Sequence, residues 1–414
     1  MKSSYKPIGK HIRLVDERNK GLRVKQLLGL SISKQFIPSV ANIVGTDMEN
    51  YKIIRKNQFA CSTMQVRRDK KMPVALLRDV DEAIISQAYP IFEVKNEKEL
   101  LPEYLMMWFE RSEFDREACF HAVGGVRGSL EWEDFESLQF PIPHIDKQRE
   151  IVKEYHAIQN RIVLNQQLIQ KLEETAQTIY KQWFVEFEFP DENGKPYKSN
   201  GGEMVWNEEL RKEIPKGWEL IPFGKYIFYQ EGPGLREWQW TDSGIKVINV
   251  KNILYDGTVD TNNSSRFISI EEYKSKYSHF LIDEGDIVIA GSGNTYGKVG
   301  KVLCNDLPLL MNTSVIRFHS LNEELMPNSF VQVYLFSPQM KEQIETSITG
   351  SAQPNFGPSH VKQMNLIYSN QNNLFHFNRL LKPVIDRKDL LNRMNKSLEQ
   401  LKELLLSKLA TVEN

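Results

Sequence analysis

Apolar positions recur in alternating steps of three and four residues through a long segment at residues 146–186. This spacing marks one face of an α-helix, and about 40 residues rising 1.5 Å each make a helix of about 60 Å. Asn165 is the one polar member of the seam, and a lone asparagine there often fixes register and partner. Pro141 and Pro143 end the strand expected before the helix, and Asp146 is the expected N-cap.

A second segment, residues 370–412, repeats the pattern with an interruption at Arg387. Either segment alone is typical of an ordinary amphipathic helix. Two such seams at equivalent places in the chain favour a mutual antiparallel coiled coil. The positions expected to pair the helices are Ile151, Ile158, Ile162, Asn165, Ile169, Leu172, Ile179, Val384, Leu391, Leu398 and Leu405.

The chain also resembles itself at a period of about 226 residues. Gly124 falls on Gly350, and the apolar residues of 135–140 fall on those of 361–366, each set typical of a short strand. Residues 8–12 and 223–227 are also alike. The chain is therefore predicted to contain two diverged copies of a domain followed by a helix.

The predicted fold is α+β, with two mixed α/β domains, two long helices and a pseudo-twofold internal repeat. The first domain is expected at residues 1–144 and its helix at 145–189. The polar, turn-rich residues 190–215 are expected to form a linker. The second domain is expected at residues 216–369 and its helix at 370–414.

Composition indicates a globular chain long enough for two cores, with 414 residues, 41% hydrophobic and 26% charged. We expect neither a membrane span nor a signal peptide. The three scattered cysteines favour a reduced, cytoplasmic compartment.

Because the net charge is −1, any DNA-binding charge must be local. One concentration is visible at residues 51–72, where seven basic residues accompany one acid, although such a run is more often a solvated loop.

Candidate catalytic motifs are weak. The glycine-rich residues 291–298 fail the P-loop pattern, because Val299 stands where a Ser or Thr would bind Mg²⁺, and they favour a hairpin with a polar tip. Asp79, Glu93 and Lys95 have the order of a nuclease metal site, a pattern that also arises by chance. Neither the tetrapeptide of an amino-methyltransferase nor a histidine cluster is present. We therefore predict a chain without catalytic residues or a metal site.

Side chains suited to base edges and phosphates gather in loops instead. The candidate DNA contacts are Ser31, Ser33, Lys34, Gln35, Ser62, Gln65, Arg67, Arg68, Lys70, Arg127, Ser129, Arg236, Ser292, Asn294, Thr295, Tyr296, Lys298, Gln353 and Asn355. Trp238 and Trp240, which follow Arg236, are ambiguous: a tryptophan there could pack in the protein core or stack on a base.

With this architecture the whole chain resembles the specificity subunits of Type I restriction-modification enzymes. The resemblance rests on the order domain, helix, domain, helix and on the segments 124–132, 140–143, 148–151, 297–300 and 350–353. The second copy departs from the pattern, because residues 366–369 lack the Pro-x-Pro exit found at 141–143.

The resemblance implies that each domain binds one half of a split, asymmetric site in double-stranded DNA. It implies that the paired helices set the spacer and dock two methyltransferase (modification) subunits. Two restriction subunits would complete an ATP-driven nuclease. The chain itself would bind no cofactor, whereas its partners would use S-adenosylmethionine, ATP and Mg²⁺.

Two alternatives stay open at this point. One is a stand-alone Mg²⁺-dependent nuclease built on Asp79, Glu93 and Lys95. The other is a coiled-coil scaffold whose domains bind protein rather than DNA. Steep salt dependence of binding would distinguish DNA recognition from the scaffold.

Overall fold

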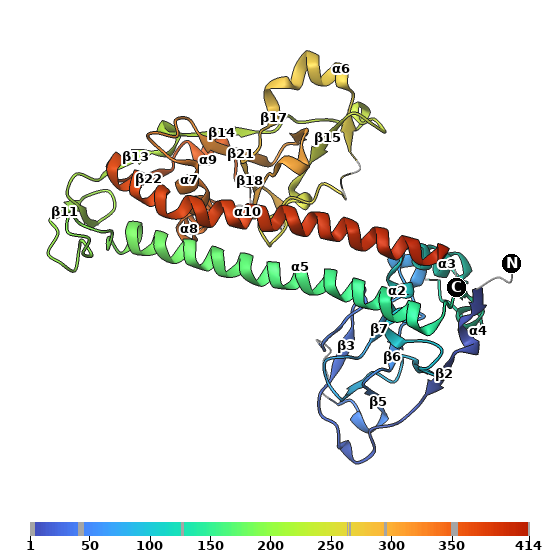
Figure 1. Cartoon of the computed structure of the whole chain (residues 1–414). Coiled ribbons are helices and arrows are strands. Elements are labelled where there is room, and N and C mark those ends of the chain that lie inside the picture. The colour runs from blue at the N-terminus through green and yellow to red at the C-terminus, as the bar shows by residue number, and fades with distance from the viewer. Residues whose placement is uncertain are drawn as a thin grey trace. The chain divides into compact units, whose positions relative to one another are not determined.

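The computed structural model describes residues 5–39, 45–125, 128–262, 264, 266–293, 296–348 and 355–412. The chain divides into two compact units (Figure 1). The first unit comprises residues 1–163 with 397–414, and the second comprises residues 164–396. Each long helix therefore contributes one end to each unit. Among the described residues, no helix is long and apolar enough to cross a membrane.

The first unit is built from short strands and helices, followed by the first long helix. The elements are β1 (Tyr5–Pro7), η1 (Ile8–Lys10), β2 (Ile12–Val15), η2 (Lys20–Leu22), β3 (Leu28–Leu30), β4 (Phe36–Pro38), η3 (Met48–Asn50), β5 (Lys52–Arg55), β6 (Phe59–Cys61), α1 (Val66–Asp69), β7 (Val74–Leu76), β8 (Glu82–Ile85), β9 (Ile91–Val94), α2 (Pro102–Glu110), α3 (Ser112–His121), α4 (Trp132–Ser137), β10 (Gln139–Pro141) and α5 (Ile145–Tyr180).

The second unit begins within α5 and contains the π-helical turn, η4 (Lys181–Val185), that ends this helix. Its elements are β11 (Met204–Asn207), β12 (Lys212–Pro215), β13 (Glu219–Pro222), η5 (Phe223–Lys225), β14 (Ile227–Glu231), η6 (Glu237–Gln239), β15 (Ile245–Ile248), η7 (Val250–Asn252), β16 (Phe267–Ile268), α6 (Ile270–Glu272), η8 (Tyr273–Tyr277), η9 (Ser278–Phe280), β17 (Leu281–Ile282), β18 (Ile287–Ala290), β19 (Val299–Lys301), η11 (Cys304–Asp306), β20 (Leu309–Met311), β21 (Val315–Ser320), α7 (Asn328–Leu335), α8 (Pro338–Ser347), α9 (Pro358–Val361), β22 (Asn365–Tyr368) and α10 (Gln371–Lys408), which continues into η12 (Leu409–Thr411) of the first unit.

The internal repeat is confirmed by the sheet topology. The first unit has an antiparallel sheet in the order β2-β9-β6-β7, and the second has one in the order β14-β21-β18-β19. Helices α3, α4 and α5 begin at residues 112, 132 and 145, and α8, α9 and α10 at 338, 358 and 371, a constant offset of 226. One domain plan is therefore used twice.

The long helices complete the cores of the units. In the first unit, Ile151 and Tyr155 of α5 are buried together with Leu406 and Leu409 from the far end of the chain. In the second unit, the Phe184 ring lies 4.8 Å from Phe330 and 5.0 Å from Phe377 of α10. The same α5 thus meets the C-terminal residues in one unit and the start of α10 in the other, as an antiparallel pair requires.

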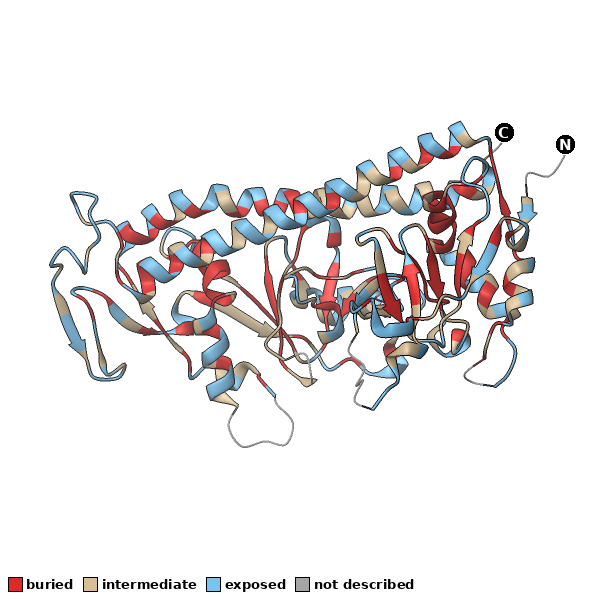
Figure 2. Cartoon of the chain, turned by 90° about the horizontal axis from the view of Figure 1, so that it is seen from below, coloured by how far each residue is buried: buried red, intermediate tan, exposed pale blue. Residues whose placement is uncertain are grey.

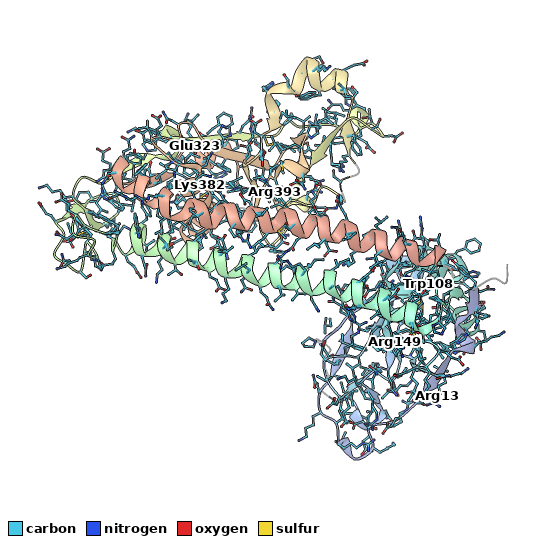
Figure 3. All side chains as sticks on the ribbon, in the orientation of Figure 1. Arg13, Trp108, Arg149, Glu323, Lys382 and Arg393 are labelled. Carbon is cyan, nitrogen blue, oxygen red and sulfur yellow. The ribbon has the colours of Figure 1, made fainter. Side chains whose placement is uncertain are left out.

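Polar contacts fix α10 on its own domain within the second unit. Lys301 Nζ lies 2.6 Å from Asp389, and Arg393, labelled with Lys382 in Figure 3, lies 2.7 Å from Glu284. Burial lowers the pKa of Lys301, an effect that the carboxylate of Asp389 opposes. These pairs lie on one face of α10, so they determine its rotation about its own axis.

Buried residues recur along both long helices (Figure 2), and some of the expected seam positions are less buried than their neighbours. On α10 the structure buries Leu391 fully but leaves Val384, Leu398 and Leu405 half-buried. The fully packed neighbours are Ile385 and Leu406, one position further along. Ile385 packs in the core of the second unit and Leu406 in the core of the first, so the globular cores, as well as the partner helix, decide which α10 residues are buried. On α5, Ile151, Ile162 and Asn165 are buried, and Ile158, Ile169, Leu172 and Ile179 are half-buried.

Two local expectations are corrected. Helix α5 begins at Ile145, so Asp146 lies inside the first turn and is not the N-cap. The backbone N–H of Asp146 donates to His144 Nδ1 at 3.4 Å. Residues 190–215 are not all loop, because β11 and β12 form an antiparallel hairpin. That segment is also packed onto the core, where Phe189 stacks 5.0 Å from Trp218.

Asn165 lies buried on the helix seam of the second unit, and its Nδ2 donates to Asn395 Oδ1 at 2.8 Å. We expect Asn165→Ala to lower the free energy of unfolding by about 1–2 kcal/mol, because Asn395 loses its partner in a half-buried place. Urea denaturation of the full chain measures this change. The exposed neighbour Gln166 is the control, and equal effects of Asn165→Ala and Gln166→Ala would contradict the assignment.

Candidate nucleic-acid interface

The hairpin tip of the first unit, residues 31–35, joins β3 to β4. Ser31 Oγ donates to the carbonyl of Gln35 at 3.0 Å and lies 2.8 Å from Ser33 Oγ. Ser33 and Gln35 are exposed, as is Ile32 between the serines. The hairpin tip is therefore a turn stabilised by hydrogen bonds within residues 31–35, and it presents the polar side chains of Ser33 and Gln35 to solvent.

Lys34 of the hairpin tip turns inward instead of outward. Its Nζ lies 2.8 Å from Asp115 Oδ1 and 5.2 Å from the centroid of the Phe114 ring. It also donates to the carbonyl oxygen of Phe109. Burial lowers the pKa of Lys34, and the Asp115 carboxylate opposes that shift. The expectation that Lys34 contacts DNA is therefore corrected, because its ammonium is enclosed by protein.

The basic run at residues 51–72 is divided by the fold into two parts. In the first part, Arg55 is paired with Glu17 at 3.0 Å and with Glu82 at 2.8 Å. Lys52 Nζ donates to the carbonyl of Tyr89 at 3.1 Å. These charges are neutralised or internally bonded, so the first part contributes little to an anion-binding surface.

The second part, which we call the basic turn, comprises residues 62–71 and contains the single helical turn α1. Gln65 and Lys70 adopt left-handed conformations at φ 65° and 51° on either side of α1. Buried Val66 anchors the turn, while Arg67, Arg68 and Lys70 are exposed. Arg68 is paired with Asp69 at 2.7 Å, which leaves Arg67, Lys70 and Lys71 as the net positive charge.

Gly124 and Gly128 lie against the basic turn. Arg67 Nη1 donates to the carbonyl of Gly124 at 3.1 Å. The backbone N–H of Leu130 donates to the carbonyl of Thr63 at 2.9 Å, and Ser62, Gln65 and Ser129 are half-buried around this junction. The structure thus brings together two loops that are about sixty residues apart. Arg127 lies outside the described residues.

The glycine-rich segment of the second unit is a hairpin, as predicted. Strand β18 pairs with β19 in antiparallel register, and a strand rather than a helix follows the glycines. At its tip Ser292 forms a β-bridge with Asn355, and the N–H of Phe356 donates to the carbonyl of Gly291 at 2.7 Å. This junction is the counterpart of Thr63 with Leu130 in the first unit. Asn294, Thr295 and Gln353 lie outside the described residues.

Tyr255 is a site residue that sequence reasoning missed. Its ring is 85% exposed, and Lys298 Nζ lies 3.5 Å from the ring centroid. Tyr296, Tyr255 and Lys298 line a cavity of about 620 Å³, together with the apolar residues Leu335 and Ile344. Nothing in the local sequence of Tyr255 indicates this position, because its partner follows more than forty residues later.

The ambiguity at residues 236–240 is resolved by burial. Trp238 is 76% exposed, whereas Trp240 is half-buried under the guanidinium of Arg266, 5.1 Å from its ring centroid. Arg236 is exposed, and its backbone N–H donates to Gln239 Oε1 at 2.9 Å. Trp240 is therefore a packing residue, while Arg236 and Trp238 are available at the surface.

The residues of the nuclease pattern are used in structural contacts. Glu93 is paired with Arg13 at 2.6 Å and accepts from Gln58. Lys95 Nζ donates to the carbonyl of Gly9 at 2.9 Å, and Asp79 is exposed. The described residues contain no group of three or more His, Cys, Asp or Glu placed to hold a metal ion. The nuclease alternative gains no support.

Comparison with known proteins points to one family. The family model described as "Type I restriction modification DNA specificity domain" matches residues 41–174 and 222–400, one stretch in each copy of the repeat. The chain is similar to the Type I restriction enzyme MjaIX specificity subunit of Methanocaldococcus jannaschii, with 23% identity over 290 residues, 70% of this chain and 63% of that protein.

Two further relatives agree. The MjaVIII specificity subunit of the same organism is 25% identical over 223 residues, 53% of this chain and 49% of that protein. The matched region thus spans under two thirds of the length of either relative. The crystal structure of the Type I restriction-modification S subunit from M. genitalium has the same fold, with a TM-score of 0.53 and 13% identity over 99% of this chain and 96% of that chain.

Gly128, at φ 36°, lies directly against the stem of Arg67, so a Cβ there would lie 2.7 Å from Arg67 Cδ. We expect Gly128→Ala to displace Arg67 from Gly124 and to lower the free energy of unfolding by about 1–2 kcal/mol. Hydrogen exchange of residues 62–71 should become faster. Gly125→Ala is the matched control, because a Cβ there meets nothing within 4 Å. Unchanged exchange in Gly128→Ala would show that Arg67 does not need the close approach.

Proposed function

Because the chain belongs to the family of Type I restriction modification DNA specificity domains, we propose that it is the DNA sequence-specificity subunit of a Type I restriction-modification complex. Each unit binds one half of a bipartite, asymmetric site in double-stranded DNA. The observation that carries this proposal is the duplicated plan, in which the same loop junction recurs in both units with different side chains on it.

The chemistry of the two loop surfaces supports recognition of DNA. Arg67, Lys70 and Lys71 gather at the first junction, and Lys298 lies at the second. Arginine and lysine suit phosphates and guanine edges, while the serines and Gln35 suit base edges more generally. A chain of net charge −1 can bind DNA where positive charge is concentrated locally, as it is in the basic turn.

Two modest contacts give high selectivity when they are held together. A module that reads a few base pairs binds weakly alone, but the second contact of a linked pair is effectively intramolecular. Each long helix has one end in each unit, so the helix pair is suited to set the number of unread base pairs between the half-sites.

The helices also carry apolar side chains that their own unit does not cover. Leu164 and Leu168 of α5 are 59% and 41% exposed in the second unit, and Leu401 and Leu404 of α10 are 48% and 50% exposed in the first. Such positions suit protein partners. We assign them to the docking of two methyltransferase subunits, with two restriction subunits added where the system also cleaves DNA.

In this complex the chain would select the DNA site, and its partners would carry out the reactions. The methyltransferase subunits would bind S-adenosylmethionine and modify adenine, and the restriction subunits would use ATP and Mg²⁺. The chain itself would bind no cofactor and would act in the cytoplasm, where its DNA substrate lies.

The test is the salt dependence of binding between the full chain and a pool of duplex DNA, measured by fluorescence anisotropy. The logarithm of the binding constant should fall steeply as the logarithm of the salt concentration rises. Arg67→Ala and Lys298→Ala should each weaken binding and make the slope shallower by about 0.9, because each removes one phosphate contact.

Arg13→Ala is the control, because Arg13 (Figure 3) is exposed but lies on β2, where it is paired with Glu93. Its slope should equal that of the unmodified chain. Binding that ignores salt, or equal slopes in all three variants, would favour the protein-binding scaffold and refute DNA recognition by these loops.

A further inference from the structure

A single buried carboxylate in the first unit contacts both candidate reading loops. Asp115 Oδ1 lies 2.8 Å from Lys34 Nζ of the hairpin tip. The same oxygen accepts a hydrogen bond of 3.0 Å from the backbone N–H of Met72, which directly follows the basic turn. The side chains of Lys34 and Asp115 are only 7% and 10% exposed. The hairpin tip and the basic turn therefore share one anchoring atom.

The Lys34–Asp115 pair is held in place by the packing of helices α2 and α3. Asp115 belongs to α3, whose Phe114 is buried against Phe109 of α2 with ring centroids 4.9 Å apart. Lys34 also donates to the Phe109 carbonyl. A second contact, from Cys119 Sγ to the carbonyl of Val66 at 3.3 Å, holds the basic turn to the same helix. Both the hairpin tip and the basic turn are thus held by contacts with helices α2 and α3.

A stability role alone explains this pair poorly. Taking both charges out of water costs several kcal/mol per ion, and well-packed apolar residues often serve the fold equally well. What the ion pair supplies is directional placement. With Lys34 held inward at φ 63°, its neighbours Ser33 and Gln35 face outward from a fixed position.

The second unit does not repeat this arrangement. Helices α3 and α8 have the same length of ten residues and an offset of 226, which places Lys341 at the position equivalent to Asp115. Lys341 is exposed and lies 3.9 Å from Glu345. Among the described residues, the Lys34–Asp115 anchor therefore has no counterpart at this position of the second unit.

We propose that the Lys34–Asp115 pair is a positioning element for sequence recognition, which sets the place of Ser33 and Gln35 relative to Arg67 without touching DNA. The inference rests on the proposed function, because it assumes that these loops read bases. It assigns base preference at one half-site to two buried residues and predicts that the other half-site is indifferent to them.

The experiment selects duplexes from a random-sequence library with the full chain and compares four proteins: the unmodified chain, Lys34→Met, Asp115→Asn and Lys52→Met. Lys52→Met is the matched control, because Lys52 is also largely buried, at 13% side-chain exposure, and donates to a backbone carbonyl, but it lies on β5. Hydrogen exchange of residues 28–38 and 64–72 is measured in parallel without DNA.

Lys34→Met and Asp115→Asn should reduce base preference at one half-site at least tenfold and leave the other half-site and the spacer unchanged. Exchange should become faster in both loop segments. Lys52→Met should alter neither base preference nor exchange in those segments. If Lys34→Met proves too unstable to purify, Asp115→Asn still keeps an oxygen acceptor for Met72 while removing the charge.

Three outcomes overturn the proposal. Unchanged exchange in both segments would show that the pair does not anchor the loops. Faster exchange with unchanged base preference would show that loop placement does not govern recognition. Equal loss at both half-sites, or the same loss in Lys52→Met, would show a general effect of instability. If the unmodified chain selects no motif, the proposed function is refuted instead. The hydrogen-exchange measurement would then still show whether the Lys34–Asp115 pair holds the two loops.

Discussion

Burial of the ends of the long helices inside the globular cores is the constraint on which the structure depends. Tyr155 of α5 and Leu409 at the end of the chain are fully buried among the residues of the first unit. Phe184, which follows α5, and Phe377 of α10 occupy the same role in the second. A large aromatic side chain buries roughly 150–250 Å², so neither unit could keep its core without its helices. The loops of each unit are consequently held in a fixed relation to the helix ends that the unit contains.

The proposed recognition of DNA would use loops that the two units hold in the same way but furnish with different side chains. The junctions of Thr63 with Leu130 and of Gly291 with Phe356 are the same backbone device in the two units. Above the first lies Arg67, and beside the second lies Lys298 over Tyr255. Because the side chains differ while the frame is kept, the two units are suited to different bases. Each can change its loops without altering the packing that holds the helices.

The periodic features of the fold could be predicted from the sequence, and the loop contacts could not. Helical spacing and the 226-residue repeat arise from local side-chain patterning, so both long helices and the duplicated domain were visible, as was the glycine-rich hairpin. On α10 the expected seam residue Leu391 is fully buried, but Ile385 is buried more completely than the expected Val384, because α10 also packs on its own domain. The inward turn of Lys34 and the neutralisation of Arg55 depend on Asp115, Glu17 and Glu82, which no local pattern connects to them. Five-residue loops carry no periodicity that could reveal such partners.

The central proposal, that the helix pair sets the spacer between the two half-sites, is tested most directly by lengthening the helices. Seven residues would be inserted in α5 after Val163 and in α10 before Ser397, where the two units divide, so that the heptad phase is kept. Selection from a random duplex library should then return both half-sites unchanged with a spacer longer by about 3 base pairs, because seven helical residues add about 10 Å and each base pair about 3.4 Å. An unchanged spacer, or loss of one half-site with the other intact, would contradict the account.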